Sequence, residues 1–321
     1  MDTLYDIACG LDVHKNSVVA CIVKTDTTSK TIDNKEILEL VKRNFTTFSE
    51  GLNELKEWIV ANECHRVAME STGVYWHPVY DALEDAFDGD IEVLVCNPRN
   101  MHNMPGKKTD MSDAEWIGRC LRSGMLTGSF IPPLVIRELR ELTRYRKSIV
   151  EDISTQKNRI EKTLQSAGFK LSSFLTDIFG VSGRNIIDAL IQNGYLAEGD
   201  VDILTKSISA EKKMEMKRLL TNKLSAHSQT VLKTKIKHLD ELLSHLIEVE
   251  ALINEITIQF EVEIKNLDTV PGISETSAKA IIAEIGTDMS KFKTAEHLCS
   301  WAGLSPGNNE SAGKKKALES L

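Results

Sequence analysis

The chain has 321 residues, a formal net charge of −8 at pH 7, 41% hydrophobic and 27% charged residues. This length predicts two or three domains, and the negative charge argues against a protein that coats nucleic acid nonspecifically. Apolar runs are far too short to span a membrane, and six scattered cysteines show no C-x-x-C pair or metal-ligand spacing. We therefore expect a cytoplasmic protein with reduced, mostly buried thiols, no membrane partner and no structural zinc.

Short apolar segments alternate with amphipathic ones through the first 130 residues. We predict strands at 6–13, 17–23, 66–70 and 91–96, and helices at 48–61, 78–86 and 111–122. Segment 36–43 is assigned to a third strand, although its ILELVK run also fits a helix. The order βββαβαβα is that of the ribonuclease-H-like fold, an α/β fold with helices on the faces of a mixed sheet.

The middle of the chain is helical in pattern and begins after Pro132-Pro133. Segment 135–167 carries apolar residues in a near-heptad rhythm, which predicts a long helix and a coiled coil. Segment 223–260 is a second long amphipathic stretch, so the two can pair within one chain or between chains. Short helices broken by Gly180, Gly183 and Gly194 are expected between them. Residues 134–170 contain nine Lys or Arg against five Asp or Glu. This excess can follow phosphates or can be a solvated helix face.

The last part opens with LDTVPGISETSAKAIIAEIG at 267–286, a Pro-Gly turn between two short apolar-patterned segments. The pattern resembles a helix-hairpin-helix, which either contacts a DNA phosphate through backbone amides or is purely structural. We divide the chain into a nuclease-like domain at 1–130, a helical region at 131–262 and a C-terminal domain at 263–321.

Four carboxylates come from separated segments that the fold brings to one sheet edge. Asp12 in GLDVHK and Glu70 in AMESTG end two predicted strands, while Asp110 and Asp113 in KKTDMSDAEW begin a predicted helix. Four carboxylates share a small volume only if cations neutralise them, and two Mg²⁺ ions prefer such oxygen ligands. The alternative is that Asp110 or Ser112 caps the helix and Asp113 favours its dipole.

Three other side chains near these carboxylates have weaker signals. Trp76 and His77 can touch a nucleotide, or can be a core aromatic and a helix-start residue. His14 shares the strand face of Asp12 if the strand continues, and otherwise begins a solvated turn with Lys15.

These motifs also carry a family likeness. GLDVHK (10–15), AMESTGVYW (68–76), NPRNMH (97–102), KKTDMSDA (107–114), VPGI (270–273) and SWAGLSPGNNESAGKKK (300–316) resemble, in this order, the transposases of the insertion sequence 110 family. The resemblance implies a RuvC-like domain whose carboxylates Asp12, Glu70, Asp110 and Asp113 bind Mg²⁺. It also implies a C-terminal transposase domain whose serine, Ser311 here, attacks DNA.

The partners implied by the resemblance are donor and target DNA, a noncoding bridge RNA, and further copies of the chain in dimers and coiled-coil tetramers. It also implies a bacterial, nucleoid-associated protein. Members continue past the serine motif with a basic helical stretch, whereas this chain ends at Leu321, which predicts a shortened C-terminal domain.

Ser311 by itself permits two interpretations. A serine hydroxyl needs a base or a metal to become a nucleophile, and the lysines at 314–316 can steady phosphate charge. The same residue types also form ordinary polar loops.

Three other functions remain open at this point. A RuvC-like junction resolvase would use the same carboxylates without Ser311, and a truncated remnant would bind nucleic acid without cutting it. An actin-like ATP-binding fold also places an Asp at a strand end, but GLDVHKNS has no glycine after Asp12 for a phosphate loop.

Overall fold

The structure is a computed structural model that describes residues 3–26, 37–84, 90–98, 112–197, 199–205 and 209–304, with backbone only at 310–311 and 314–315. The chain divides into two compact units, Met1–Ile131 and Pro132–Leu321. Each unit has its own core. In the described ranges no helix is long and apolar enough to cross a membrane.

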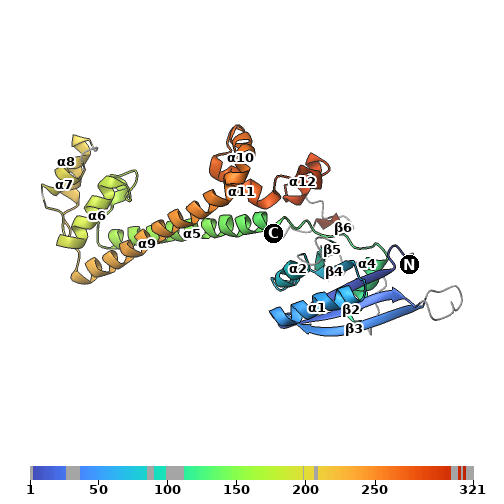
Figure 1. Ribbon diagram of the computed structural model, residues 1–321. Helices are drawn as coiled ribbons and strands as arrows, with labels where there is room; N and C mark the ends of the chain where they lie inside the picture. Colours follow the sequence, from blue (N-terminus) through green and yellow to red (C-terminus); the bar gives the residue numbers. More distant parts are fainter. Residues whose placement is uncertain are drawn as a thin grey trace. The chain divides into compact units, whose positions relative to one another are not determined.

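The first unit is built on a mixed five-stranded sheet of order β3-β2-β1-β4-β5 (Figure 1). Its strands are β1 (Ile7–Val13), β2 (Ser17–Thr25), β3 (Leu38–Thr46), β4 (Arg66–Glu70) and β5 (Glu92–Cys96). The first three strands form an antiparallel meander, and β4 and β5 continue the sheet parallel to β1. The predicted ribonuclease-H-like fold is confirmed, and the ambiguous ILELVK segment is a strand.

Helices cover both faces of this sheet (Figure 1). On one face α1 (Ser49–Ala61) and α2 (Trp76–Glu84) bury leucine and isoleucine side chains against alternate residues of the strands. On the other face α4 (Asp113–Arg122) packs mainly on β1 and β2. The α4 side of the core contains Ala8, Ala68, Cys96, Trp116, Ile117, Cys120, Leu121 and Leu126.

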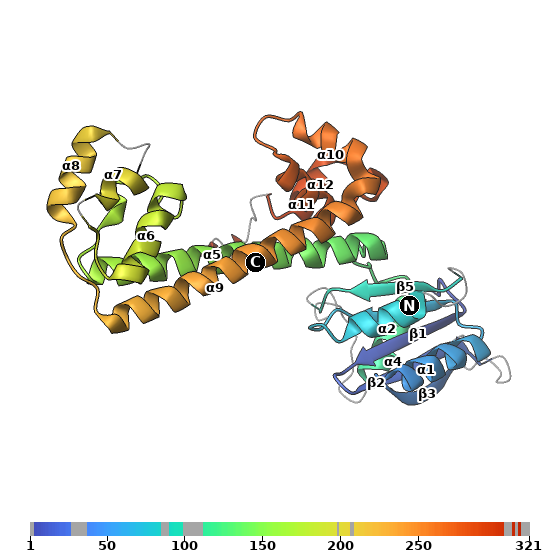
Figure 2. The same cartoon turned by 60° about the vertical axis from the view of Figure 1, so that its left-hand side comes forward.

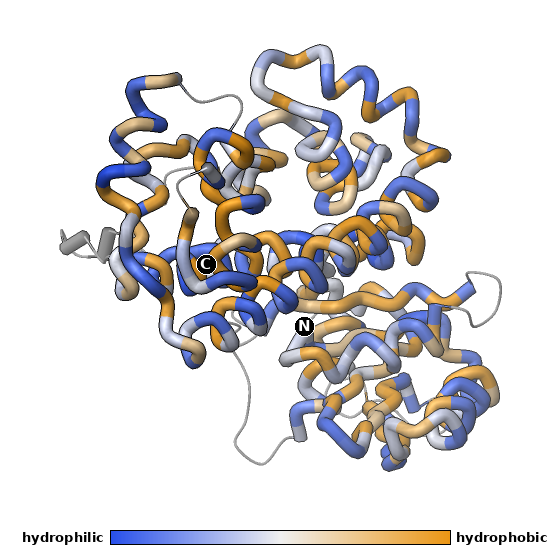
Figure 3. The backbone as a smooth tube through the Cα atoms, turned by 90° about the vertical axis from the view of Figure 1, so that its left-hand side faces the viewer, coloured by the Kyte–Doolittle hydropathy of each residue, from blue (hydrophilic) through white to orange (hydrophobic). Residues whose placement is uncertain are grey.

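Two long helices form the axis of the second unit. The helix α5 (Leu134–Ser166) runs antiparallel to α9 (Ala226–Thr257), and the two lie side by side along their length (Figure 2). Gln156 is buried between them and donates to the carbonyl of Lys235 at 2.8 Å. Hydrophobic and hydrophilic segments alternate along these helices, as an amphipathic pair requires (Figure 3). The predicted long helices therefore pair within one chain, while a coiled coil between chains stays a prediction.

Short helices connect α5 to α9. Gly180 and Gly194 flank the helix α6 (Val181–Asn193), as predicted. Gly183 lies inside this helix, so the predicted break at Gly183 is wrong. A Cβ at Gly183 would lie 2.2 Å from the carbonyl oxygen of Ile178, so this glycine allows close packing. The helices are η2 (Leu171–Ser173), α6 (Val181–Asn193), α7 (Asp200–Leu204) and α8 (Ala210–Leu219).

The chain after α9 folds back onto the long pair, with α11 (Glu275–Ile285) against α5. The predicted Pro-Gly turn joins α10 to α11, and Gly272 adopts a φ of 92° there. A DNA-contacting hairpin at this turn stays a prediction, as does a domain boundary between 262 and 263. The elements are η3 (Ile258–Phe260), α10 (Glu261–Asp268), α11 (Glu275–Ile285), η4 (Met289–Lys291), α12 (Ala295–Trp301), β6 (Glu310–Ser311) and β7 (Lys314–Lys315).

Candidate active site

The fold places Asp12 and Glu70 side by side. The parallel register of β1 and β4 pairs Leu11 with Met69. The residues that follow them, Asp12 and Glu70, are therefore neighbours on the two strands. A Cβ at Gly10 would point at the backbone of α4. Side chains two apart on a strand share a face, so Asp12 also lies on the α4 side. By the same alternation Glu70 follows Ala68, which belongs to the α4 side of the core.

The two carboxylates are partly exposed and have no Lys or Arg partner within the described ranges. The Asp12 side chain is 28% exposed, and its Oδ2 lies 3.2 Å from Nε2 of the more exposed His14. Glu70 lies opposite Cys96 in the register of β4 and β5. Burial, and then the negative charge of Glu70, raise the pKa of the Cys96 thiol to about 11. The end of the sheet is thus a local concentration of negative charge without a neutralising cation from these strands.

The start of α4 lies on the same side of the sheet. Ser112 caps the helix by accepting a hydrogen bond from Glu115 N at 3.4 Å, and Asp113 is the exposed first residue. The carbonyl of the next residue, Ala114, lies against Gly10, two residues before Asp12. The helix begins two residues later than predicted, and the alternative role of Ser112 as its cap is confirmed. Asp110 lies outside the described residues.

A buried carboxylate that sequence reasoning missed holds the first turn of α4. Glu115 is 8% exposed, and its Oε2 accepts from Lys42 Nζ of β3 at 2.7 Å. Its Oε1 accepts from Arg119 Nε at 3.0 Å. Burial acts to raise the pKa of Glu115, but the bonds from Lys42 and Arg119 outweigh it, and the pKa is lowered. The spacing of Glu115 and Arg119, four apart on a helix, was the available signal.

The donor chemistry of Asp12 and Glu70 fits a hard divalent cation, because both offer carboxylate oxygens and neither is occupied by Lys or Arg. Among the described residues no group of three or more Asp, Glu, His or Cys side chains is arranged to hold a metal ion. The described strands therefore place two carboxylates together, and Asp113, although described, does not complete a group of three with them.

The remaining predicted residues divide between core and C-terminal strand. Trp76 is 9% exposed in the core of the first unit, with its ring 3.9 Å from that of His77, so the core interpretation of Trp76 is confirmed. Ser311 pairs with Lys314 in the register of β6 and β7. Its side chain lies outside the described residues, so its meeting with the carboxylates stays a prediction.

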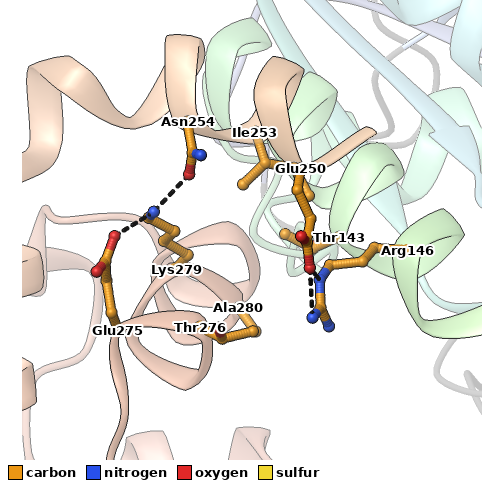
Figure 4. A pocket seen from close by; sticks show the side chains of 9 residues that line it. All are labelled: Thr143, Arg146, Glu250, Ile253, Asn254, Glu275, Thr276, Lys279 and Ala280. Carbon is orange, nitrogen blue, oxygen red and sulfur yellow. Dashed lines mark hydrogen bonds and ion pairs between the residues drawn. The ribbon is translucent and has the colours of Figure 1, made fainter. Parts of the chain in front are cut away.

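The second unit has a polar pocket of about 230 Å³ between α5, α9 and α11 (Figure 4). Its two cations are already neutralised. Lys279 lies 2.6 Å from Asn254 Oδ1 and also pairs with Glu275, while Arg146 pairs with Glu250 at 2.7 Å. The pocket thus offers no free charge to a ligand, and the carboxylate pair of the first unit is the better candidate for chemistry.

Comparison with protein families decides the relationship. Residues 9–169 match the DEDD transposase family of IS110, and residues 264–321 match a family described as "Transposase IS116/IS110/IS902 family". The chain belongs to the IS110 family of transposases. Its first match contains Asp12, Glu70 and Asp113, and its second contains Ser311. The resemblance predicted from the sequence is confirmed, and the protein is an enzyme of the class that cuts and recombines DNA.

Solved structures similar to this transposase include Thermus thermophilus RuvC, at 12% identity, a TM-score of 0.28, and coverage of 38% of this chain and 99% of that one. The same protein in complex with a Holliday junction substrate matches at 11% identity and a TM-score of 0.27, with 38% and 99% coverage. Fowlpox virus resolvase with Holliday junction DNA matches at 17% identity and a TM-score of 0.23, with 32% and 65% coverage. No curated protein sequence matches the chain.

Proposed function

We propose that this transposase excises and inserts its own insertion sequence, with Asp12, Glu70, Asp110 and Asp113 holding Mg²⁺ and Ser311 attacking the DNA backbone. The observation that carries the proposal is the placement of Asp12 beside Glu70 on the face covered by α4. Asp113 opens that helix, and the family match covers both the carboxylate and the serine segments.

In this scheme the carboxylates bind Mg²⁺ and fix its position. Asp12 and Glu70 are fixed by a five-stranded sheet, so their relative position is set by the backbone and not by flexible loops. Bound Mg²⁺ supplies Lewis-acid stabilisation of phosphate charge and lowers the pKa of a coordinated hydroxyl. His14, in contact with Asp12, lies where it can accept a proton while remaining open to solvent.

Ser311 is the group that becomes bonded to DNA. Its Oγ loses a proton and forms a bond to phosphorus, while the bond from phosphorus to one strand oxygen breaks and that oxygen takes up a proton. The resulting serine-phosphate ester conserves the energy of the broken linkage, so the reverse attack by a strand hydroxyl rejoins DNA without a nucleotide cofactor.

Donor DNA, target DNA and a bridge RNA are the partners of this scheme, and α5 and α9 join chains into dimers and tetramers. Exposed apolar residues on α9 support the assembly. Leu243 and Ile247 are one turn apart, and the Ile247 side chain is 68% exposed.

The test is cleavage of donor and target duplexes with Mg²⁺ and RNA from the flanking DNA, followed on a denaturing gel that retains protein-linked DNA. Asp12→Asn and Glu70→Gln should abolish both cleavage and the covalent adduct. Ser311→Ala should abolish the adduct. Glu57→Gln, an exposed acid on α1, is the matched control and should behave as wild type.

Two outcomes would contradict the proposal. Cleavage by Ser311→Ala at the wild-type rate would replace it with a RuvC-like nuclease that uses only carboxylates. Cleavage by Glu70→Gln at the wild-type rate would remove the carboxylate site itself.

A further inference from the structure

The charge of α9 and the segment before it reverses abruptly along the chain. Residues 216–239 contain six Lys or Arg, two His and no Asp or Glu. Residues 240–263 contain seven Asp or Glu and no Lys or Arg. A solvated helix face ordinarily mixes both signs, because alternating charges stabilise it. The separation of charge therefore indicates that residues 216–239 and residues 240–263 have different surroundings when the protein functions.

The segment of α5 that packs on the basic part of α9 is itself basic. Residues 156–170 contain four Lys or Arg and one Glu. Lys235 Nζ donates to Thr163 Oγ1 at 2.7 Å and to the Arg159 carbonyl at 3.3 Å, which holds the two segments together. We call residues 156–170 and 216–239 the basic half; it comprises the facing ends of α5 and α9 together with the end of α8 and the loops beside them. It carries ten Lys or Arg and one Glu in a chain whose net charge is −8.

Ion pairs reach only part of the basic half, where Lys217 pairs with Asp202 and Lys237 with Glu241. In the acidic part of α9, Glu250 pairs with Arg146 of α5 at 2.7 Å. In the basic half, Arg159, Lys162 and Lys233 are exposed, and none has an ion-pair partner among the described residues. Arg159 and Lys162 are three apart on α5, so they lie on one face, adjacent to Lys235. Like charges this close repel each other, and an external anion would relieve the repulsion.

The dimensions of the basic half match a double helix. The basic part of α9 from Ala226 to residue 239 is about 21 Å long at ~1.5 Å per residue. Duplex DNA presents about one phosphate per 1.7 Å of axis, or roughly twelve phosphates over that length. A pair of packed helices fixes the backbone from which its cations extend, so the ordering cost of binding falls mainly on the Lys and Arg side chains.

We propose that the basic half of the α5–α9 pair is a docking surface for the phosphate backbone of duplex DNA. The choice of DNA rests on the proposed function, because the substrate of the carboxylate site would extend beyond the cut. Lys and Arg contacts to phosphate position a duplex without reading its sequence. The surface therefore adds affinity and orientation to any DNA, and sequence choice comes from elsewhere.

The test measures binding of the full chain to a mixed-sequence duplex of about 30 base pairs by fluorescence anisotropy, over a range of salt concentrations with a metal chelator. Arg159→Gln with Lys162→Gln should weaken binding and reduce the slope of log affinity against log salt by about 1.8, since each lost phosphate contact removes about 0.9. The matched control, Lys56→Gln with Lys147→Gln, removes two cations that also lack an ion-pair partner in the described structure, outside the basic half. Its slope should equal that of wild type.

An unchanged slope in the Arg159→Gln, Lys162→Gln variant would overturn the proposal, as would an equal loss in the control. A slope change seen with single-stranded RNA but not with duplex DNA would also overturn it and assign the surface to RNA. Circular dichroism should show the same helix content in all variants. Glu70→Gln separates the two proposals, because it should abolish cleavage while leaving the chelated binding slope intact.

Discussion

Gly10 of β1 and Gly118 of α4 bring their backbones into contact: a Cβ at Gly10 would lie 2.3 Å from Gly118 N and 2.1 Å from Ala114 O. Both neighbours are backbone atoms, which cannot rotate away. The absence of two side chains thus sets how closely the helix that begins at Asp113 approaches the strand that carries Asp12.

Gly10→Ala should therefore move α4 and destabilise the first unit by about 1–3 kcal/mol or more, as overpacking of a close contact does. The first unit should unfold at a lower temperature, and the amides of α4 should exchange faster. Gly128→Ala is the control, because its Cβ would meet Leu94, with the side chain at 3.3 Å and the nearest backbone atom in ordinary contact at 3.8 Å. If both variants unfold at the same temperature, the close approach does not fix the helix.

The contact between Lys42 and Glu115 predicts a pH dependence. The lowered pKa of Glu115 means that its stabilising contribution is present above the ordinary value of 4.5 and is lost as the pH falls through the lowered value. Glu115→Gln should cost about 1–3 kcal/mol at neutral pH, as expected when charged hydrogen bonds are weakened at a buried site. The difference in unfolding free energy between wild type and variant should shrink as the pH falls below 4.5.

Urea unfolding between neutral and acidic pH measures this difference. Glu57→Gln, an exposed substitution, should stay within about 0.5 kcal/mol of wild type throughout. A wild-type advantage that grows on acidification would contradict the ion-pair account.

Much of the fold could be predicted because local pattern and burial agree. The Arg66–Glu70 strand has a short apolar centre and the long helix near 135–167 has a near-heptad rhythm, and both elements are present. The segment that became β3 has a mixed pattern, and its identity depends on pairing with β2, a contact that no local window contains. Gly183 was misjudged because its packing against Ile178 is likewise tertiary.

The candidate site could be predicted in part for a similar reason. Asp12 and Glu70 stand at strand ends, which the pattern locates, and the parallel register brings them together. The role of Glu115 could not be predicted because it depends on a hydrogen bond from Lys42, 73 positions away in the chain. The place of Ser311 relative to the carboxylates depends on two units that pack separately, and no sequence period encodes it.

Two arginines on α5 reach the end of α11, and their different burial predicts different contributions to stability. Arg140 Nη2 donates to the Glu284 carbonyl at 2.7 Å and its Nε to the Ala283 carbonyl at 3.1 Å, with the side chain 21% exposed. Arg144 makes two bonds of 2.9 Å to the Glu284 carboxylate, but its side chain is 65% exposed. Arg140→Met should therefore cost about 1.5–3 kcal/mol and Arg144→Met at most about 1 kcal/mol.

Hydrogen exchange of the α11 amides tests this order without requiring two-state unfolding of the whole chain. Raising the salt concentration should reduce the effect of Arg144→Met more than that of Arg140→Met, because the exposed pair is screened. An equal effect of both variants at every salt concentration would show that the bonds to the α11 carbonyls add nothing.

The thiols of the protein should differ sharply in reactivity. All six cysteines are free, five are buried, and Cys299 is exposed. Burial raises the pKa of Cys21, Cys64 and Cys120 to about 11, so their thiolate fraction at neutral pH is negligible. A thiol reagent should label one cysteine per native chain and six after unfolding, and Cys299→Ser should abolish the native reaction. Rapid native labelling of Cys299→Ser would show that the sheet opens far more often than its packing predicts.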